Sequence, residues 1–161
     1  LIILLEPPHA ALQAAPLLAA LRRGFPAVRL EVLVPDHAAS ALAGNPNQDG
    51  ILTASGSLME KVRAVRSRRY ELVIDLTNSP VSALLTRMAG AGIRIGYRAA
   101  STISKWLKRA LCYTHTIMAK REQRGPVRHY LLVSEALGLD AAPPELSPDP
   151  GESPAMMKSM R

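Results

Sequence analysis

The hydrophobic pattern of this chain is clearest between residues 70 and 98. Residues 72–76 form a short, almost wholly apolar run rich in β-branched side chains, which is typical of a strand buried on both faces of a parallel sheet. Residues 77–80 are a turn cluster, and residues 81–88 then carry apolar side chains at helical spacing. Residues 93–97 have the pattern of a further strand. We therefore predict a strand–helix–strand unit with a right-handed crossover, whose first strand lies centrally in the sheet.

The rest of the chain alternates in the same way between strand-like and helix-like segments. Further strands are predicted at residues 1–5, 28–34, 50–53 and 113–117, and further helices at residues 10–23, 36–43, 57–69, 101–111 and 127–137. This alternation predicts a Rossmann-like α/β domain, with a mostly parallel sheet and helices on both faces.

Local signals place the ends and faces of these helices. Ser57 and Glu60 form a capping-box pattern, and Asp36 can cap the short helix that follows it. Pro16 is expected to kink the first helix or to mark a late start. The side chains expected on the inner faces are Leu12, Ala15, Leu18, Ala19 and Leu21 in the first helix, Val81, Leu84, Leu85 and Met88 in the helix at 81–88, and Leu131, Leu132 and Ala136 in the last.

The composition is that of a folded domain. The chain has 161 residues, of which 48% are hydrophobic, enough for one domain with a sizeable core. Residues 1–140 are predicted to form this domain, and the proline-rich residues 141–161 to form a linker or tail. Cys112 is the only cysteine, so no internal disulfide is possible and a reducing cytoplasm is the expected compartment. The apolar start of the chain is interrupted too often for a transmembrane helix.

The charge of the chain points to an anionic partner. Its net charge of +7 suits nucleic acid, a phosphorylated substrate or an anionic membrane surface, and a merely basic surface is the alternative. Nine basic residues and a single acid lie in residues 94–128. Arg98 is our candidate for direct phosphate contact, since it ends a predicted strand and its guanidinium can grip two oxygens. Lys105, Lys108 and Arg109 share one face of a predicted amphipathic helix that could lie on a membrane, unless they form a solvated basic face.

Candidate chemistry lies in the loops that follow the predicted strands, because ligands of parallel α/β sheets bind beyond the carboxyl ends of the strands. Glu6 and His9 are the titratable groups of the first such loop and are our candidate general bases. The alternative is that both are solvated loop residues. Asn78 and Ser79 suit the binding of sugar hydroxyls in an acceptor, or alternatively cap the following helix.

No metal, cofactor or nucleic-acid site is predicted. Asp75 is expected to pair locally, and His37, His115 and His129 lack the spacing of metal ligands. No glycine-rich phosphate loop follows a strand, so we expect no nucleotide cofactor on these residues. The basic residues are not interleaved with stacking aromatics, so nucleic acid is not an expected partner.

Short segments of the chain, taken in order, resemble one known family. They are Pro16–Pro26 (PLLAALRRGFP), Leu42–Pro46 (LAGNP), Arg68–Asp75 (RRYELVID), Ser82–Leu85 (SALL), Arg94–Tyr97 (RIGY), and Tyr130-Leu131 with Ala136-Leu137-Gly138. Their order and spacing are similar to those in the N-terminal half of the bacterial heptosyltransferases of lipopolysaccharide core synthesis, glycosyltransferase family 9. The resemblance runs from Leu1 to about Leu139.

This resemblance implies the N-terminal domain of a two-domain GT-B fold. The first domain of the family largely binds a phosphorylated, lipid-linked saccharide acceptor, and the second binds the ADP-sugar. The expected reaction is metal-independent transfer of heptose from ADP-heptose to the lipopolysaccharide inner core. This chain would be the acceptor-side half, inactive alone, with ADP-heptose bound by a second domain that these residues do not include. Its expected place is the cytoplasm, in peripheral contact with the inner face of the cytoplasmic membrane.

Two features of the family pattern are missing here, and one of them is a His before the helix at residues 127–137, where Gly125 stands. The family carries a Gly-Asp pair just before the first helix, and its Asp is expected to activate the acceptor hydroxyl. The pair falls on His9 and Ala10 here, and alanine cannot accept a proton. Glu6 or His9 would then have to supply the base. The alternative function is a non-catalytic basic binding domain, either a degenerate glycosyltransferase-like domain or one that binds anions or nucleic acid.

Overall fold

A six-stranded parallel sheet forms the centre of the molecule. The computed structural model describes residues 1–98, 111–118 and 132–139. The strands lie in the order β3-β2-β1-β4-β5-β6, and every pairing between neighbours is parallel. Their bounds are β1 (Ile2–Ile3), β2 (Glu31–Val34), β3 (Gly50–Thr53), β4 (Leu72–Asp75), β5 (Ile93–Arg98) and β6 (His115–Met118). The predicted α/β class is confirmed.

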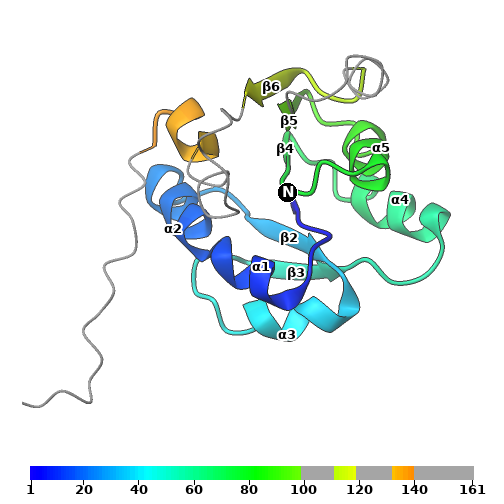
Figure 1. Ribbon diagram of the computed structural model, residues 1–161, viewed down its shortest axis with the longest axis horizontal. Helices are drawn as coiled ribbons and strands as arrows, with labels where there is room; N and C mark the ends of the chain where they lie inside the picture. Colours follow the sequence, from blue (N-terminus) through cyan, green and yellow to red (C-terminus); the bar gives the residue numbers. More distant parts are fainter. Residues whose placement is uncertain (99–110, 119–131, 140–161) are drawn as a thin grey trace, which may run out of the picture.

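Helices cover both faces of this sheet, as the alternating pattern predicts (Figure 1). Their bounds are α1 (Pro8–Gln13), α2 (Ala15–Gly24), η1 (Asp36–Ala38), α3 (Ala39–Leu42), α4 (Leu58–Arg66) and α5 (Pro80–Met88), and residues 132–136 are also helical. One hydrophobic core joins the sheet to α1, α2, α3 and Val133, and a second joins the opposite face to α4 and α5. No helix in the part of the chain described above is long and apolar enough to cross a membrane.

The two central strands are β1 and β4, which lie side by side. Ile2, Ile3 and Ile74 are almost fully buried, and β1 pairs with β2 on one side and β4 on the other. Their uniformly apolar sequences fit this place, since a strand covered on both faces has no solvent-facing positions. The central position predicted for residues 72–76 is therefore confirmed.

The first predicted helix, residues 10–23, is broken into α1 and α2. α1 ends at Gln13, and Pro16 lies in the first turn of α2, where a residue without an N–H is tolerated. The predicted late start is wrong, because the helical segment already begins at Pro8, and the interruption expected from Pro16 is a break at Ala14 that changes which residues face inward. Leu12 is 57% exposed, whereas Leu17 and Ala20 are buried.

Some other predicted bounds and faces are wrong. The second strand begins at Glu31 rather than at residue 28, and Val28 is 49% exposed. Asp36 does not cap its helix, because the chain enters a 3-10 turn from Pro35 with no side-chain cap. In the last helix Ala136 is exposed while Val133 and Ser134 are buried, and Leu131 lies outside the described residues, as does nearly all of the predicted helix 101–111.

The helix α5 begins as predicted but turns a different face to the sheet. Ser79 is its N-cap and Pro80 its first residue, and Gly90 ends the segment with a φ of 74°. The buried side chains are Ser82, Ala83, Leu85 and Thr86, while Val81 and Leu84 are exposed. Ser82 and Ser79 form a capping box through reciprocal bonds. The capping box of Ser57 and Glu60 at α4 is also confirmed.

Candidate functional site

The carboxyl edge of the sheet, where the parallel strands end, brings two of the predicted loops together. The backbone N–H of Leu5, after β1, donates to Thr77 Oγ1, after β4, over 2.6 Å. β1 and β4 are neighbours in the sheet, so the loops that leave them start side by side. Residues 72 positions apart in the chain therefore share one site, which holds Glu6 on one loop and Asn78 and Ser79 on the other.

Asp75 organises the second of these loops. This side chain is fully buried, and its Oδ1 accepts from the backbone N–H groups of Thr77 (2.9 Å) and Asn78 (3.0 Å). Its Oδ2 accepts from the hydroxyl of Tyr113 over 2.6 Å. Burial raises the pKa of Asp75 above its ordinary value, although the hydrogen bonds, that from Tyr113 foremost, act in the opposite direction. The local pairing predicted for Asp75 is confirmed.

Tyr113 is a site residue that sequence reasoning missed. It lies just before β6, and its ring packs over Gly96 of β5, where an added Cβ would lie 2.5 Å from a ring carbon. A side chain at position 96 would therefore displace the ring whose hydroxyl reaches Asp75. The glycine within a β-branched strand was a sequence signal for such a close approach.

Asn78 and Ser79 differ in their structural roles. Ser79 Oγ accepts from the backbone N–H of Ser82 over 3.0 Å, so the helix-cap interpretation of Ser79 is confirmed. Asn78 has a φ of 53°, in the left-handed region that asparagine tolerates better than most residues. The hydrogen bond from its N–H to Asp75 holds it there. Both residues are half-buried and lie in the loop at the carboxyl edge of the sheet.

Glu6 and His9 lie at the same edge, at the start of α1. Glu6 is half-buried in the loop, and His9 is exposed in the first turn of the helix. Ala10, the residue after His9, is only 7% exposed.

The predicted basic residues are only partly within the described structure. Arg98 is the last residue of β5, so its backbone lies at the carboxyl edge, two strands from β1. Lys105, Lys108 and Arg109 lie outside the described residues. Among residues 1–98, 111–118 and 132–139, no three His, Cys, Asp or Glu side chains lie close enough together to hold a metal ion.

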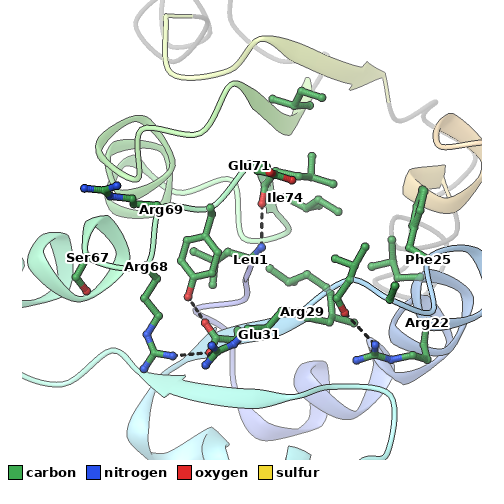
Figure 2. A pocket seen from close by; sticks show the side chains of 18 residues that line it. Leu1, Arg22, Phe25, Arg29, Glu31, Ser67, Arg68, Arg69, Glu71 and Ile74 are labelled. Atoms are coloured by element: carbon green, nitrogen blue, oxygen red, sulfur yellow. Dashed lines mark hydrogen bonds and ion pairs between the residues drawn. The ribbon is translucent and has the colours of Figure 1, made fainter.

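A second feature, which sequence reasoning also missed, lies at the opposite edge of the sheet. A cavity of about 870 Å³ opens between the end of α2, the start of β2, the turn before β4 and the start of β5. We call it the amino-edge cavity (Figure 2). The cavity lies where the strands begin, whereas the loops described above lie where the strands end. Figure 2 shows Glu31, Arg29 and Arg68 gathered at one side of the cavity.

Glu31 is a buried acid at the wall of this cavity. Its Oε1 accepts from Arg29 (2.8 Å) and Arg68 (2.5 Å), and its Oε2 accepts from the hydroxyl of Tyr70. Burying a carboxylate costs on the order of several kcal/mol unless it is paired, and the hydrogen bonds from these three donors offset this cost for Glu31. Burial raises the pKa of Tyr70, and its hydrogen bond to the charged Glu31 adds to the effect.

The fold and the carboxyl edge define a class of protein. A parallel six-stranded sheet, covered by helices on both faces and carrying polar loops where its central strands end, is a Rossmann-like α/β domain of the kind that forms half of a GT-B fold. The sequence model of glycosyltransferase family 9 (heptosyltransferase) matches residues 59–159, more than half of the chain. The chain therefore belongs to glycosyltransferase family 9.

Solved structures with the same fold include several heptosyltransferases. A glycosyl transferase family 9 protein from Veillonella parvula matches with a TM-score of 0.72 and 21% identity, over 86% of this chain and 40% of that one. E. coli heptosyltransferase WaaC with ADP has a TM-score of 0.70 and 20% identity, over 88% and 48%. E. coli ADP-heptose lps heptosyltransferase II has a TM-score of 0.66 and 19% identity, over 81% and 39%. At such identities the likeness shows the fold.

The chain spans less than half the length of each of these three proteins. A sequence search of curated proteins found no significant match.

Proposed function

We propose that this chain is the acceptor-side half of a heptosyltransferase that transfers heptose from ADP-heptose to the inner core of lipopolysaccharide. The observation that carries the proposal is the hydrogen bond from Leu5 to Thr77, which holds the two polar loops together at the carboxyl edge. In a family 9 protein this edge is where a ligand of the parallel sheet is expected. The names of two similar structures, both heptosyltransferases and one with ADP, support the choice of donor.

The proposed reaction requires a base on this half. The acceptor hydroxyl gives its proton to the Glu6 carboxylate or the His9 imidazole as its oxygen bonds to the anomeric carbon of heptose. The bond from that carbon to ADP breaks, and the electron pair leaves with the diphosphate. ADP-heptose itself is proposed to bind a second domain, after the proline-rich residues 141–161, while residues 1–140 form the acceptor domain.

The acceptor is proposed to be a phosphorylated, lipid-linked saccharide. Asn78 and Ser79 would contact its hydroxyls, and Arg98 would grip a phosphate through two N–H groups. Lys105, Lys108 and Arg109 would add positive charge toward the membrane that carries the lipid. The proposed place of the protein is thus the cytoplasm, in peripheral contact with the inner face of the cytoplasmic membrane.

Vesicles carrying truncated lipopolysaccharide test the acceptor. The 161-residue chain should bind them, more weakly as salt rises, and Arg98→Ala and a triple variant of Lys105, Lys108 and Arg109 to Ala should bind at least tenfold more weakly. The matched control is a triple variant in which three exposed arginines of α4 and α5 are replaced by Ala, namely Arg63, Arg66 and Arg87. Equal losses in both triple variants at about 0.15 M salt, where charges interact over about 8 Å, would assign the binding to net charge alone.

Calorimetric titration with ADP-heptose tests the division of roles. We expect no binding to this chain, because the nucleotide sugar is assigned to the other domain. Micromolar binding would show that the roles of the domains are reversed.

A non-catalytic binding domain is the second candidate, and the largely buried Ala10 in place of the family's Asp favours it. A gel shift with random-sequence DNA and RNA tests the nucleic-acid form of this candidate. Binding that is tighter than that to the acceptor vesicles would favour it over the transferase.

A further inference from the structure

A chain of hydrogen bonds links the two loops of the candidate site to each other and to the segment before β6. The Tyr113 hydroxyl donates to Asp75 over 2.6 Å, and Asp75 also accepts from the backbone N–H of Thr77 over 2.9 Å. The Thr77 hydroxyl in turn accepts from the backbone N–H of Leu5 over 2.6 Å. Tyr113 and Asp75 are buried and the other two are half-buried, so these bonds are stronger than they would be in water.

The Thr77 hydroxyl stands where the backbone ladder between β1 and β4 would otherwise continue. The carbonyl oxygen of Ile3 accepts from the N–H of Leu76 over 2.9 Å. A regular parallel ladder would next join the N–H of Leu5 to the carbonyl oxygen of Leu76. That N–H meets the Thr77 side chain instead. The place of one loop relative to the other therefore depends on the identity of residue 77.

The same chain fixes the backbone of two residues that the proposed function uses. Glu6 directly follows Leu5, whose N–H is held by Thr77. Asn78 directly follows Thr77, and its own N–H donates to Asp75 over 3.0 Å at a φ of 53°. A carboxylate accepts hydrogen bonds, and a side-chain amide both donates and accepts them, so the pair suits sugar hydroxyls.

We propose that Thr77 is a positioning residue of the acceptor site, held by Asp75 and Tyr113, which sets Glu6 and Asn78 to meet the saccharide hydroxyls of one acceptor. The inference rests on the proposed function, because that function takes the two loops as the acceptor site. Groups that are ordered before binding give a tighter complex, since the loops need not be ordered by the ligand. Recognition of the saccharide thus depends on this hydrogen-bond chain, whereas attraction to anionic groups depends on the basic residues.

Two kinds of vesicle separate these contributions. Vesicles with truncated lipopolysaccharide present saccharide and phosphate, whereas phosphatidylglycerol vesicles present phosphate without a saccharide. Sedimentation of the 161-residue chain with each kind measures both affinities. Thr77→Val removes the hydroxyl at nearly constant volume, so it should weaken binding to the lipopolysaccharide vesicles about tenfold and leave binding to phosphatidylglycerol unchanged. Unfolding would not produce this selective loss, so the ratio of the two affinities reports positioning.

Two matched variants serve as controls. Thr77→Ser keeps the hydroxyl and should bind both kinds of vesicle as the parent does. Thr114→Val removes a hydroxyl that also accepts a backbone N–H, that of Arg94 over 2.8 Å, but at the amino ends of β5 and β6. It should leave the ratio of affinities unchanged. Urea unfolding establishes that each variant is folded under the binding conditions.

Tyr113→Phe tests the far end of the chain. It removes the hydroxyl that donates to Asp75 and keeps the ring over Gly96, so it should lower the affinity ratio in the same direction as Thr77→Val. Because both residues act through one chain, the double variant should lose less than the product of the two single losses. A loss equal to that product would show that the two residues act separately and would contradict the proposed chain.

The parent chain distinguishes failure of this inference from failure of the proposed function. If the parent has no preference for the lipopolysaccharide vesicles, the proposed acceptor is wrong and the positioning role falls with it. If the parent has this preference and Thr77→Val keeps it, or Thr114→Val loses it equally, the acceptor stands and only the positioning role is overturned.

Discussion

Two buried carboxylates act as single-residue links between segments that are distant in the chain. Asp75 connects the end of β4, the loop after it and Tyr113, and Glu31 connects β2 to Arg68 and Tyr70 before β4. Asp75 Oδ1 accepts from two backbone N–H groups, whereas the other carboxylate oxygens accept from side chains. The identity of such a residue matters because its loss removes the acceptor that several donors share.

Replacement of Asp75 should separate the role of its shape from that of its charge. Asp75→Ala removes the acceptor of two loop N–H groups and one hydroxyl, so it should lower the free energy of unfolding by at least about 2 kcal/mol. Asp75→Asn keeps an acceptor for the loop and can donate to the Tyr113 oxygen, so it should cost much less. Urea unfolding of the two variants measures this, and equal losses would contradict the assigned role.

The pH dependence of stability should carry the signature of Asp75. Its pKa in the folded protein is raised from the ordinary value of 3.8, so above that pH the folded state binds more protons than the unfolded state. The Asp75 contribution to stability therefore falls as pH rises from about 4 through the raised pKa. Asp75→Asn lacks this loss, so its stability relative to the parent should rise over that interval. A constant difference between pH 4 and 8 would show that the pKa is not raised.

At the scale of elements, local sequence signals set the ends of helices, while contacts across the sheet decide strand pairing. Ser57, Glu60 and Ser79 cap α4 and α5 through bonds within four residues, so a local pattern suffices to predict them. β5 pairs with β6 across the sheet, and the Tyr113 ring, just before β6, lies on Gly96 of β5.

Replacement of Gly96 tests how much this contact with the Tyr113 ring contributes to the stability of the protein. Gly96→Ala places a Cβ 2.5 Å from the Tyr113 ring, so it should cost about 1–3 kcal/mol through overpacking. Gly92→Ala is the matched control, because an added Cβ there meets nothing within 4 Å. The free energy of unfolding of Gly92→Ala should be unchanged or slightly higher than that of the parent, because alanine lowers the conformational entropy of the unfolded chain. Thermal unfolding of both variants measures the difference, and similar midpoints would mean that the ring moves away freely.

At the scale of the whole molecule, β1 and β4 join the two hydrophobic cores. The loops of the candidate site leave the carboxyl ends of these two strands, so the central pair supports both loops. Local opening is least favourable where both faces of a strand are covered.

Hydrogen exchange tests this arrangement. The amides of β1 and β4 should exchange most slowly, because their bonds, such as Ile74 N–H to Leu1 O and Leu76 N–H to Ile3 O, both 2.9 Å, lie at the centre of the sheet. Those of the edge strands β3 and β6 serve as internal controls and should exchange faster. Slow exchange at the edges with fast exchange in β4 would contradict the strand order.

The fold was largely predictable from the sequence, and the site only in part. Period and composition identify β4, α5 and β5, because a buried strand and a capped helix each have a local pattern. The inner face of the first helix was predicted wrongly, since its break at Ala14 shifts the helical phase and exposes Leu12. The rule that ligands bind at the carboxyl edge predicted that the loops of Glu6, Asn78 and Ser79 lie at this edge, but not the contacts between them.

The sequence by itself therefore determined the α/β class, the central strand and the capped starts of α4 and α5. Only the tertiary structure decided that Leu5 meets Thr77, that Tyr113 reaches Asp75, and that Arg29, Arg68 and Tyr70 converge on Glu31. The physical reason is the separation along the chain between the residues that interact. Periodicity and capping arise from interactions within about one helical turn, whereas these contacts depend on strand order, which brings together residues up to 72 positions apart.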